Sequence, residues 1–210
     1  MKLLTRDIFR ESVFERDNHS SIINPTKITD FNRSIESLQE FWLFCIFVAG
    51  KNSDIAASKL RELSDVLPDG NESLFDKLKK LSATDITDYL VKAKVGQYGR
   101  ITNAILDTLM IDIDTASLED LLNIRGVGPK TARFFLLHSR KDCSHAVLDT
   151  HILKWLSRLG YSDVPKATPQ VSRIYSHREK IFVDRARKMW PNLSIAEIDL
   201  LIWSEVSGRK

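Results

Sequence analysis

Residues 121–159 read LLNIRGVGPKTARFFLLHSRKDCSHAVLDTHILKWLSRL, and this stretch decides the fold. A short apolar segment ends at Ile124, two glycines flank Val127, and Pro129 stands where a second helix would begin. The glycines allow a tight turn and leave backbone amides uncovered by side chains. Proline suits the first helical position because an N–H group there has no helical partner. The stretch therefore predicts a helix–hairpin–helix whose exposed amides and helix N-terminus bind an anion, for which phosphate is the natural candidate.

Helical patterns also account for the rest of the chain. Apolar residues recur at helical spacing in successive segments, and the sequence shows no strand pattern of any length and no internal repeat. The length of 210 residues and the hydrophobic content of 43% are enough for a sizeable core and argue against disorder. We expect an all-α protein in which residues 1–210 form a single domain of two lobes. The lobe with the hairpin would span about 52–164, and the second lobe would combine about 1–51 with about 165–210.

Charge is distributed unevenly along the chain, although the formal net charge is only +3. Residues 85–122 hold seven acidic and three basic side chains, whereas residues 123–160 hold seven Lys or Arg, two Asp and three His. A solvated helix surface would explain such a basic segment by itself. Its position beside the glycine hairpin favours a nucleic acid as the partner.

The cysteines and the apolar runs indicate which cellular compartment and which cofactors to expect. The two cysteines, Cys45 in an apolar run and Cys143 in a polar one, do not suggest a disulfide framework, which favours a reducing, intracellular compartment such as the cytoplasm, nucleoid or nucleus. No cysteine–histidine cluster has metal-ligand spacing, so we expect neither a zinc site nor an iron–sulfur cluster. The longest apolar run, 41–49, is too short to span a membrane, and residues 1–17 do not resemble a signal peptide.

Lys130 is the first candidate for chemistry. It would occupy the second position of a helix, where the helix dipole is positive, and Arg125 and Arg133 lie nearby in the sequence. These positive charges favour the neutral amine, which is the form that attacks an electrophilic carbon. A lysine that only contacts a DNA phosphate explains the local sequence equally well.

Asp149 is the second candidate and has an equally simple alternative role. It lies nineteen residues after Lys130 and directly precedes THILKWL (150–156), so it makes a good helix N-cap. A capping carboxylate stays ionised and could also face a developing positive charge, as in the oxocarbenium-like transition state of glycosidic cleavage. The spacing alone does not decide between the two roles.

The segments LLNIRGVGPKTA (121–132) and AVLDTH (146–151) resemble the signature of the helix–hairpin–helix DNA glycosylase superfamily, HhH-GPD. Bifunctional members of that superfamily carry a lysine just after the hairpin and an aspartate about nineteen residues later, and Lys130 and Asp149 fall on these positions. The resemblance is specific over 117–159 and looser over 38–207. It implies the two-lobed helical fold of these enzymes and a DNA glycosylase with AP-lyase activity on damaged double-stranded DNA.

Three further segments point to the 8-oxoguanine branch of the superfamily, namely FCIFVAGKNSDIAA (44–57), VGQYGRI (95–101) and EIDLLIWSEVSG (197–208). The chain lacks the four-cysteine cluster of the endonuclease III and adenine glycosylase branches. Only some 30 residues precede the first core helix, so we expect no N-terminal β-domain. The resemblance implies 8-oxoguanine as the first substrate to test. An oxidised pyrimidine or another modified base, and a non-catalytic DNA-binding protein, remain alternatives.

The resemblance also implies roles for individual residues. Lys130 would attack C1′ and form a Schiff base that permits β-elimination, while Asp149 would stabilise the developing cation. The expected DNA contacts are Arg125, Gly126, Val127, Gly128, Thr131, Asn52 and His151. Main-chain carbonyls of Leu122, Ile124 and Val127 would hold a structural K⁺ or Na⁺, and no other cofactor is expected.

Stacking on the flipped base is expected from one of the aromatic residues Trp42, Phe44, Trp190 or Trp203. Aromatic residues at helical spacing more often pack in a core than line a pocket, so not all four can serve. We expect the protein to act as a monomer and to have no membrane partner.

Overall fold

The structure of the protein is a computed structural model, which is described for residues 23–24 and 27–207. This part of the chain forms ten α-helices and contains no β-strand, which confirms the predicted all-α class. The helices in chain order are α1 (Ile35–Phe47), α2 (Ser53–Val66), α3 (Leu74–Lys79), α4 (Ala83–Lys92), α5 (Tyr98–Thr108), α6 (Leu118–Leu122), α7 (Pro129–Ser139), α8 (Thr150–Arg158), α9 (Ser172–Met189) and α10 (Ile195–Ser207).

Short-range hydrogen bonds set where several of these helices begin. Ser34 caps α1, and Ser82 and Ser117 form capping boxes with the aspartates three residues later, at the starts of α4 and α6. Each such cap stabilises a helix by about 1 kcal/mol, because it satisfies backbone N–H groups that lack a helical partner. The helix starts therefore follow from residues that are neighbours in the sequence.

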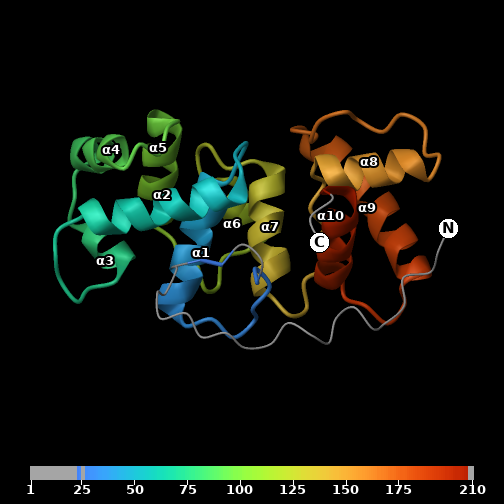
Figure 1. The fold of residues 1–210 in the computed structure, drawn as a ribbon, viewed down its shortest axis with the longest axis horizontal. Helices are drawn as coiled ribbons and strands as arrows, with labels where there is room; N and C mark the ends of the chain where they lie inside the picture. The colour runs from blue at the N-terminus through green and yellow to red at the C-terminus, as the bar shows by residue number, and fades with distance from the viewer. Residues whose placement is uncertain (1–22, 25–26, 208–210) are drawn as a thin grey trace.

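Helix α1 forms the centre of the first core. Its residues Leu38 and 41–47 are all buried, so it needs neighbours on every side. It packs against α2, α3, α5 and α7, and Figure 1 shows it among these helices. This core draws on residues from Ile23 to Leu136.

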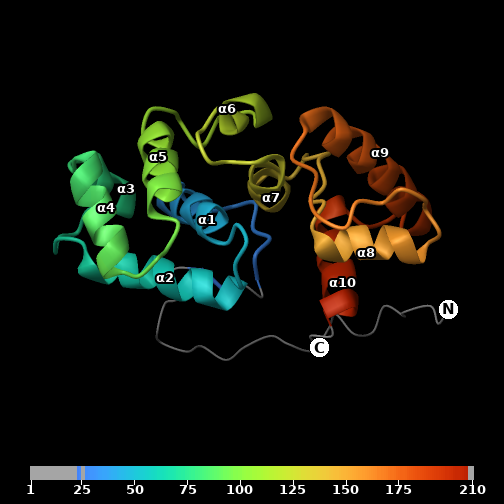
Figure 2. The same ribbon diagram turned by 90° about the horizontal axis from the view of Figure 1, so that it is seen from above.

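A second core gathers residues from Leu137 to Ile202, contributed mainly by α8, α9 and α10. The two cores therefore meet within α7, and Figures 1 and 2 show α8, α9 and α10 grouped on the far side of α7 from α1. This division corrects the lobe boundaries predicted from the sequence. Helix α1, which was assigned to the second lobe, belongs with the hairpin, because an all-round apolar helix packs where it can be covered on every side. Helix α8, which was assigned to the hairpin lobe, packs on α10.

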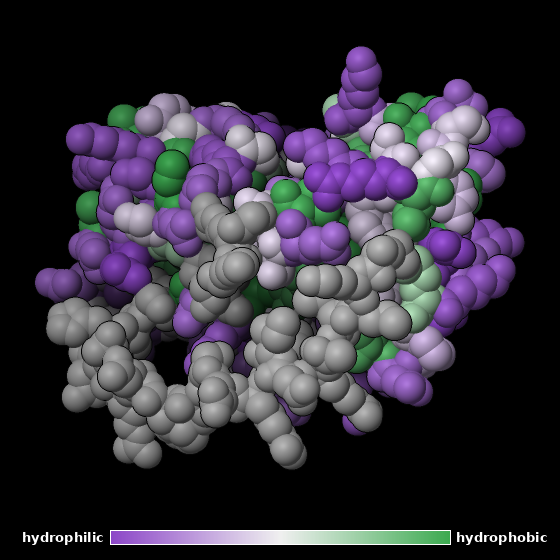
Figure 3. Space-filling model, turned by 45° about the vertical axis from the view of Figure 1, so that its right-hand side comes forward, coloured by the Kyte–Doolittle hydropathy of each residue, from purple (hydrophilic) through white to green (hydrophobic). Residues whose placement is uncertain are grey.

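On the face drawn in Figure 3, hydrophilic side chains predominate among the coloured residues, with hydrophobic patches between them. Within the part of the chain that the structure describes, no helix is both long enough and apolar enough to cross a membrane.

Candidate active site

The hairpin between α6 and α7 turns at Gly126, whose φ of +81° lies in the left-handed region that favours glycine. The Val127 N–H donates to the Ile124 carbonyl at 3.1 Å, which closes the turn. This bond corrects one expectation, because the Val127 amide was predicted to bind phosphate and is instead used inside the hairpin. It also occupies one lone pair of the Ile124 carbonyl, which was predicted to hold a cation. Gly128 precedes α7, and a Cβ there would lie 3.2 Å from Oε1 of Gln170.

Arg100, near the start of α5, fixes the position of the hairpin through hydrogen bonds. Its Nη1 donates to the Gly126 carbonyl at 3.0 Å, and its Nη2 donates to the Ile46 carbonyl at 2.8 Å. Its Nε donates to Oε1 of Gln97 at 2.5 Å. One guanidinium therefore joins α1, α5 and the hairpin. Sequence reasoning did not identify this role, and the only signal was an arginine in the glycine-bracketed loop 95–101.

Substituting Gly126 with alanine is expected to weaken binding of a DNA duplex by about tenfold. The positive φ costs an alanine roughly 1–2 kcal/mol, which corresponds to about a tenfold effect if the hairpin must shift to relieve it. A Cβ would also lie 2.6 Å from Cγ of Arg100, a side chain pinned by three hydrogen bonds. Fluorescence anisotropy with a labelled duplex measures the change.

The matched control is Gly99→Ala, because a Cβ on Gly99 meets no atom within 4 Å. Gly99 lies inside α5, where alanine should stabilise the helix by about 0.5–1 kcal/mol and leave DNA binding unchanged. Equal affinities of Gly126→Ala and Gly99→Ala would show that the hairpin does not grip the strand.

Lys130 is half-buried and occupies the second position of α7, as predicted. The two arginines expected to add positive charge beside it are both engaged by carboxylates. Arg125 forms a bidentate pair with Asp107, whose carboxylate also accepts the Arg125 N–H at 2.9 Å. This pairing lowers the pKa of Asp107. The structure therefore corrects the prediction of a positive cluster around Lys130 and gives Arg125 a structural role in the hairpin.

Arg133 is buried and ties α7 to the segment that carries Asp149. Its Nε donates to Oε1 of Glu179 at 2.8 Å, and that oxygen also accepts the Ala146 N–H at 2.8 Å. Burial raises the pKa of Glu179, but hydrogen bonds from His145, Arg133 and the Ala146 N–H outweigh it and lower the pKa overall. The predicted DNA contact Thr131, on the same helix, is buried with 8% exposure.

Asp149 caps α8, as one of the two sequence readings predicted. Its Oδ1 accepts the N–H groups of His151 and Ile152 at 2.8 and 2.9 Å. Its other oxygen, Oδ2, lies 3.1 Å from Nδ1 of His151. The preceding backbone is fixed from α9, because the Tyr175 hydroxyl accepts the Leu148 N–H at 2.7 Å. The carboxylate is therefore held in place while 17% of its side chain stays exposed to a reacting group.

Asp199 of α10 is a third titratable group whose pKa responds to the charges of Lys130 and Asp149. Asp199 is buried, and burial raises the pKa of its carboxyl above the ordinary value. Interaction with His138 lowers this pKa, the negative charge of Asp149 raises it, and the positive charge of Lys130 lowers it. Helix α10, which carries Asp199, packs on both α7, where Lys130 lies, and α8, which Asp149 caps. Sequence reasoning missed Asp199, although an aspartate between Ile198 and Leu200 in an apolar helix was a visible signal.

The four aromatic candidates divide into core and site residues. Trp42 and Phe44 are completely buried in the first core, and Nε1 of Trp42 donates to Oγ1 of Thr108 at 2.9 Å. Trp190 packs against Trp155, with ring centroids 5.8 Å apart. Trp42 and Phe44 are therefore core residues, whereas Trp190 is partly exposed and packs against the second core. Trp203 is partly exposed, and its ring lies 6.2 Å from that of His151, so it alone of the four is placed beside the candidate catalytic aspartate.

The remaining predicted contacts have local roles in the structure. Asn52 caps α2 by accepting the N–H groups of Asp54 and Ile55 at 2.8 and 3.3 Å, and it is exposed.

Across residues 23–24 and 27–207, no group of three or more His, Cys, Asp or Glu side chains could hold a metal ion.

The chain is also similar to known proteins. A family model described as 8-oxoguanine DNA glycosylase (Ogg-HhH) matches residues 25–190. The 8-oxoguanine DNA glycosylase/AP lyase of Thermoplasma volcanium is 28% identical over 198 residues, which cover 90% of this chain and 91% of the relative. The protein of the same description from Saccharolobus islandicus (strain L.S.2.15 / Lassen #1) is 25% identical over 186 residues, covering 84% and 87%.

The fold also matches a solved structure, that of Methanocaldococcus jannaschii 8-oxoguanine glycosylase/lyase in complex with a 15mer DNA containing 8-oxoguanine. The TM-score is 0.66 at 23% identity, and the match covers 90% of this chain and 88% of that one.

Proposed function

Since the chain belongs to the 8-oxoguanine DNA glycosylase family, we propose that it removes an oxidised base from DNA and cleaves the strand at the resulting site. The observation that supports the proposal is that Lys130, at the N-terminus of α7, and Asp149, at the N-terminus of α8, lie on two helices that both pack on α10. A nucleophile and a fixed carboxylate at one site are what a bifunctional glycosylase requires.

In the proposed reaction, the neutral amine of Lys130 attacks C1′ of the flipped nucleotide, and the bond from C1′ to the base breaks. The electron pair of that bond leaves with the base, which takes up a proton. Asp149 faces the positive charge that develops on the sugar, and its two backbone hydrogen bonds hold its carboxylate in place. One amine proton passes to the departing base, and the C1′–O4′ bond then breaks with uptake of a proton on O4′, which leaves a protonated Schiff base. Loss of a C2′ proton then breaks the C3′–O bond by β-elimination, and the 3′ phosphate leaves.

The hairpin would position the strand for this chemistry. With the Val127 N–H used internally, the amides of Gly126 and Gly128 remain as the proposed phosphate ligands, at the positive end of α7. Such contacts fix the register of the strand and read no sequence. We also propose that the main-chain carbonyls of Leu122, Ile124 and Val127 hold a monovalent cation. The Ile124 carbonyl oxygen would bind it through the lone pair that does not accept the Val127 N–H.

For the excised base, we propose 8-oxoguanine. Relatives of the same family carry this substrate in their descriptions, and they align with most of the chain. Trp203 offers a partly exposed ring beside His151 and Asp149, so we propose that it stacks on the flipped base. A DNA-repair enzyme works where the DNA lies, so we propose that the protein acts inside the cell.

A panel of duplexes, each with a single lesion, tests the proposal. We expect excision of 8-oxoguanine to exceed that of oxidised pyrimidines by at least about 100-fold, a factor that contacts to one polar group can supply. Borohydride added during the reaction should trap the Schiff base as a covalent adduct. If an oxidised pyrimidine is excised preferentially, the proposed reaction is supported and the proposed substrate is wrong. DNA binding with no excision and no adduct would instead identify a non-catalytic DNA-binding protein.

A further inference from the structure

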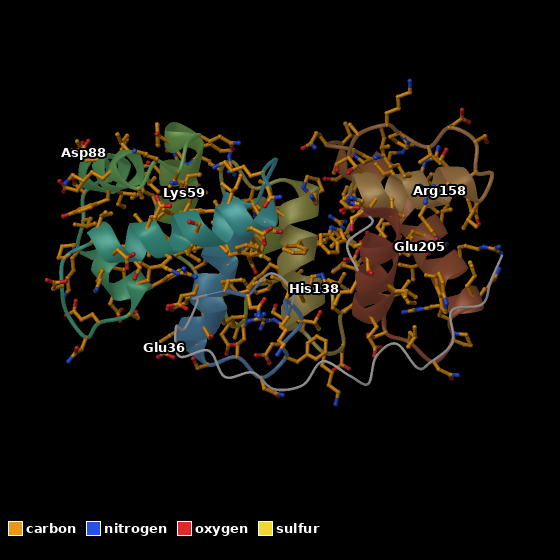
Figure 4. The ribbon with its side chains drawn as sticks, in the orientation of Figure 1. Glu36, Lys59, Asp88, His138, Arg158 and Glu205 are labelled. Atoms are coloured by element: carbon orange, nitrogen blue, oxygen red, sulfur yellow. The ribbon has the colours of Figure 1, made fainter. Side chains whose placement is uncertain are left out.

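Residues 143–149, which lead from α7 to the start of α8, form neither helix nor strand. Figure 4 labels His138 in the last turn of α7, from which this segment leads away. The Asp149 N–H donates to the Val147 carbonyl at 2.9 Å, so the backbone turns at Leu148 just before α8 begins. The place of the proposed catalytic carboxylate therefore depends on what holds this turn.

Tyr175 of α9 holds the turn with its hydroxyl group. The hydroxyl accepts the Leu148 N–H at 2.7 Å and donates to the Ala146 carbonyl at 3.0 Å. Burial raises the pKa of the Tyr175 phenol, so the hydroxyl keeps the proton that it donates. All three residues are buried, where a hydrogen bond is stronger than in water and an unpaired polar group is costly. The backbone directly before Asp149 is therefore fixed by a side chain of another helix.

Two further side chains hold the same turn. Oε1 of Glu179 accepts the Ala146 N–H at 2.8 Å, and Oγ1 of Thr168 donates to the Leu148 carbonyl at 2.9 Å. Together with the Tyr175 hydroxyl, these groups bond the N–H and the carbonyl of both Ala146 and Leu148. The turn is thus held by side chains of α9 and of the segment before it.

Arg133 of α7 connects these contacts to the start of the helix that carries Lys130. Its guanidinium lies over the Tyr175 ring, with Cζ 4.3 Å from the ring centroid. Its Nη1 donates at 3.4 Å to the carbonyl of Pro129, the residue before Lys130. A continuous series of contacts therefore runs from the backbone beside Lys130, through Arg133 and Tyr175, to the backbone beside Asp149.

We propose that Tyr175 is a positioning residue for base excision, because its hydroxyl sets where the Asp149 carboxylate lies relative to Lys130. The inference rests on the proposed glycosylase and lyase function. Excision needs the carboxylate, which faces the charge that develops as the base leaves. A preformed abasic site has already lost its base, so its Schiff base with Lys130 should need the carboxylate much less. Loss of the Tyr175 hydroxyl should therefore slow excision more than it slows adduct formation at an abasic site.

The experiment measures two rates for Tyr175→Phe and for the wild type. These are single-turnover excision of 8-oxoguanine and formation of the borohydride-trapped adduct on a duplex with a preformed abasic site. Phenylalanine keeps the ring beside Arg133 and removes only the hydroxyl. We expect excision to slow by about 10- to 100-fold, because a misplacement of about 1 Å can cost about 100-fold in rate. Adduct formation and the Kd for the duplex should change little, whereas a purely structural loss would lower both rates equally.

Thr108→Val is the matched control. Thr108 is also completely buried, and its hydroxyl accepts Nε1–H of Trp42 at 2.9 Å and donates to the Ala104 carbonyl at 2.6 Å. The control should lower the melting temperature by a similar amount to Tyr175→Phe, since each variant leaves a buried N–H unsatisfied. Because Trp42 and Ala104 belong to the first core, away from the turn before Asp149, the ratio of the two rates should stay at the wild-type value.

Two further variants complete the test. Thr168→Val removes the hydroxyl that donates to the Leu148 carbonyl, at a half-buried position where a substitution costs less stability. It should lower the ratio of excision to adduct formation by a smaller factor than Tyr175→Phe does. Combining Tyr175→Phe with Asp149→Asn should slow excision no further than Asp149→Asn alone, because Tyr175 acts through Asp149.

The proposal is overturned if Tyr175→Phe and Thr168→Val leave the ratio of the two rates unchanged, or if the effects of Tyr175→Phe and Asp149→Asn on excision multiply. If Tyr175→Phe does not fold, the ratio measured for Thr168→Val decides. A wild type that excises nothing and forms no adduct with abasic DNA contradicts the proposed function instead.

Discussion

Replacing Lys130 with glutamine is expected to abolish the covalent adduct that borohydride traps between the protein and lesion-containing DNA. Without the amine no Schiff base can form, and loss of a nucleophile lowers the rate of such reactions by roughly 10⁴- to 10⁶-fold. The fold should tolerate the change, because a positive charge at the second position of α7 opposes the helix dipole. The variant should therefore melt at or slightly above the wild-type temperature. Adduct formation is measured by denaturing gel electrophoresis and base excision by single-turnover kinetics.

Lys154→Gln provides the matched control for this prediction. Lys154 is exposed on α8, so its loss removes one positive charge without touching the site. Both variants should lose a similar, small amount of DNA affinity, since each removes at most one phosphate contact. An adduct that persists in Lys130→Gln at the wild-type level would show that Lys130 only binds phosphate.

Replacing Asp149 with asparagine is expected to slow base excision by about 10²- to 10³-fold, the usual effect of removing one electrostatic contact to a transition state. Stability should change by less than about 1 kcal/mol, because asparagine caps a helix as well as aspartate does. Asp149 accepts the His151 and Ile152 N–H groups through Oδ1, which an asparagine oxygen can replace. DNA affinity should be equal or higher, since a negative charge beside the phosphates is lost.

Asp149→Ala is the control variant, because it separates the role of Asp149 as a helix cap from the role of its charge. Asp149→Ala should lose both the charge and the cap, and so should melt at a lower temperature than Asp149→Asn by the equivalent of about 1 kcal/mol. If Asp149→Asn excises at the wild-type rate while Asp149→Ala is slow, the aspartate is a structural cap and its charge has no part in the reaction.

Much of the candidate site could be predicted from the sequence because its decisive features are local. The turn at Gly126 and the start of α7 at Pro129 depend on residues within a few positions of each other, and the structure has both. The cap formed by Asp149 is equally local. By contrast, the roles of Trp42 and Phe44 were wrong, because the pattern of an apolar helix does not reveal that it will be covered on all sides.

The sequence by itself determined the helical class, the hairpin, and the places of Lys130 and Asp149 at two helix starts, since short-range hydrogen bonds and backbone preferences decide these. Only the tertiary structure decided which helices form each lobe and which carboxylates neutralise Arg125 and Arg133. It also buried Asp199 on α10, which packs on the helices of both catalytic candidates. Arg125 and Asp107 are 18 residues apart in the sequence, and Arg133 and Glu179 are 46 residues apart. Pairs at such separations depend on how whole helices pack, which no local sequence pattern encodes.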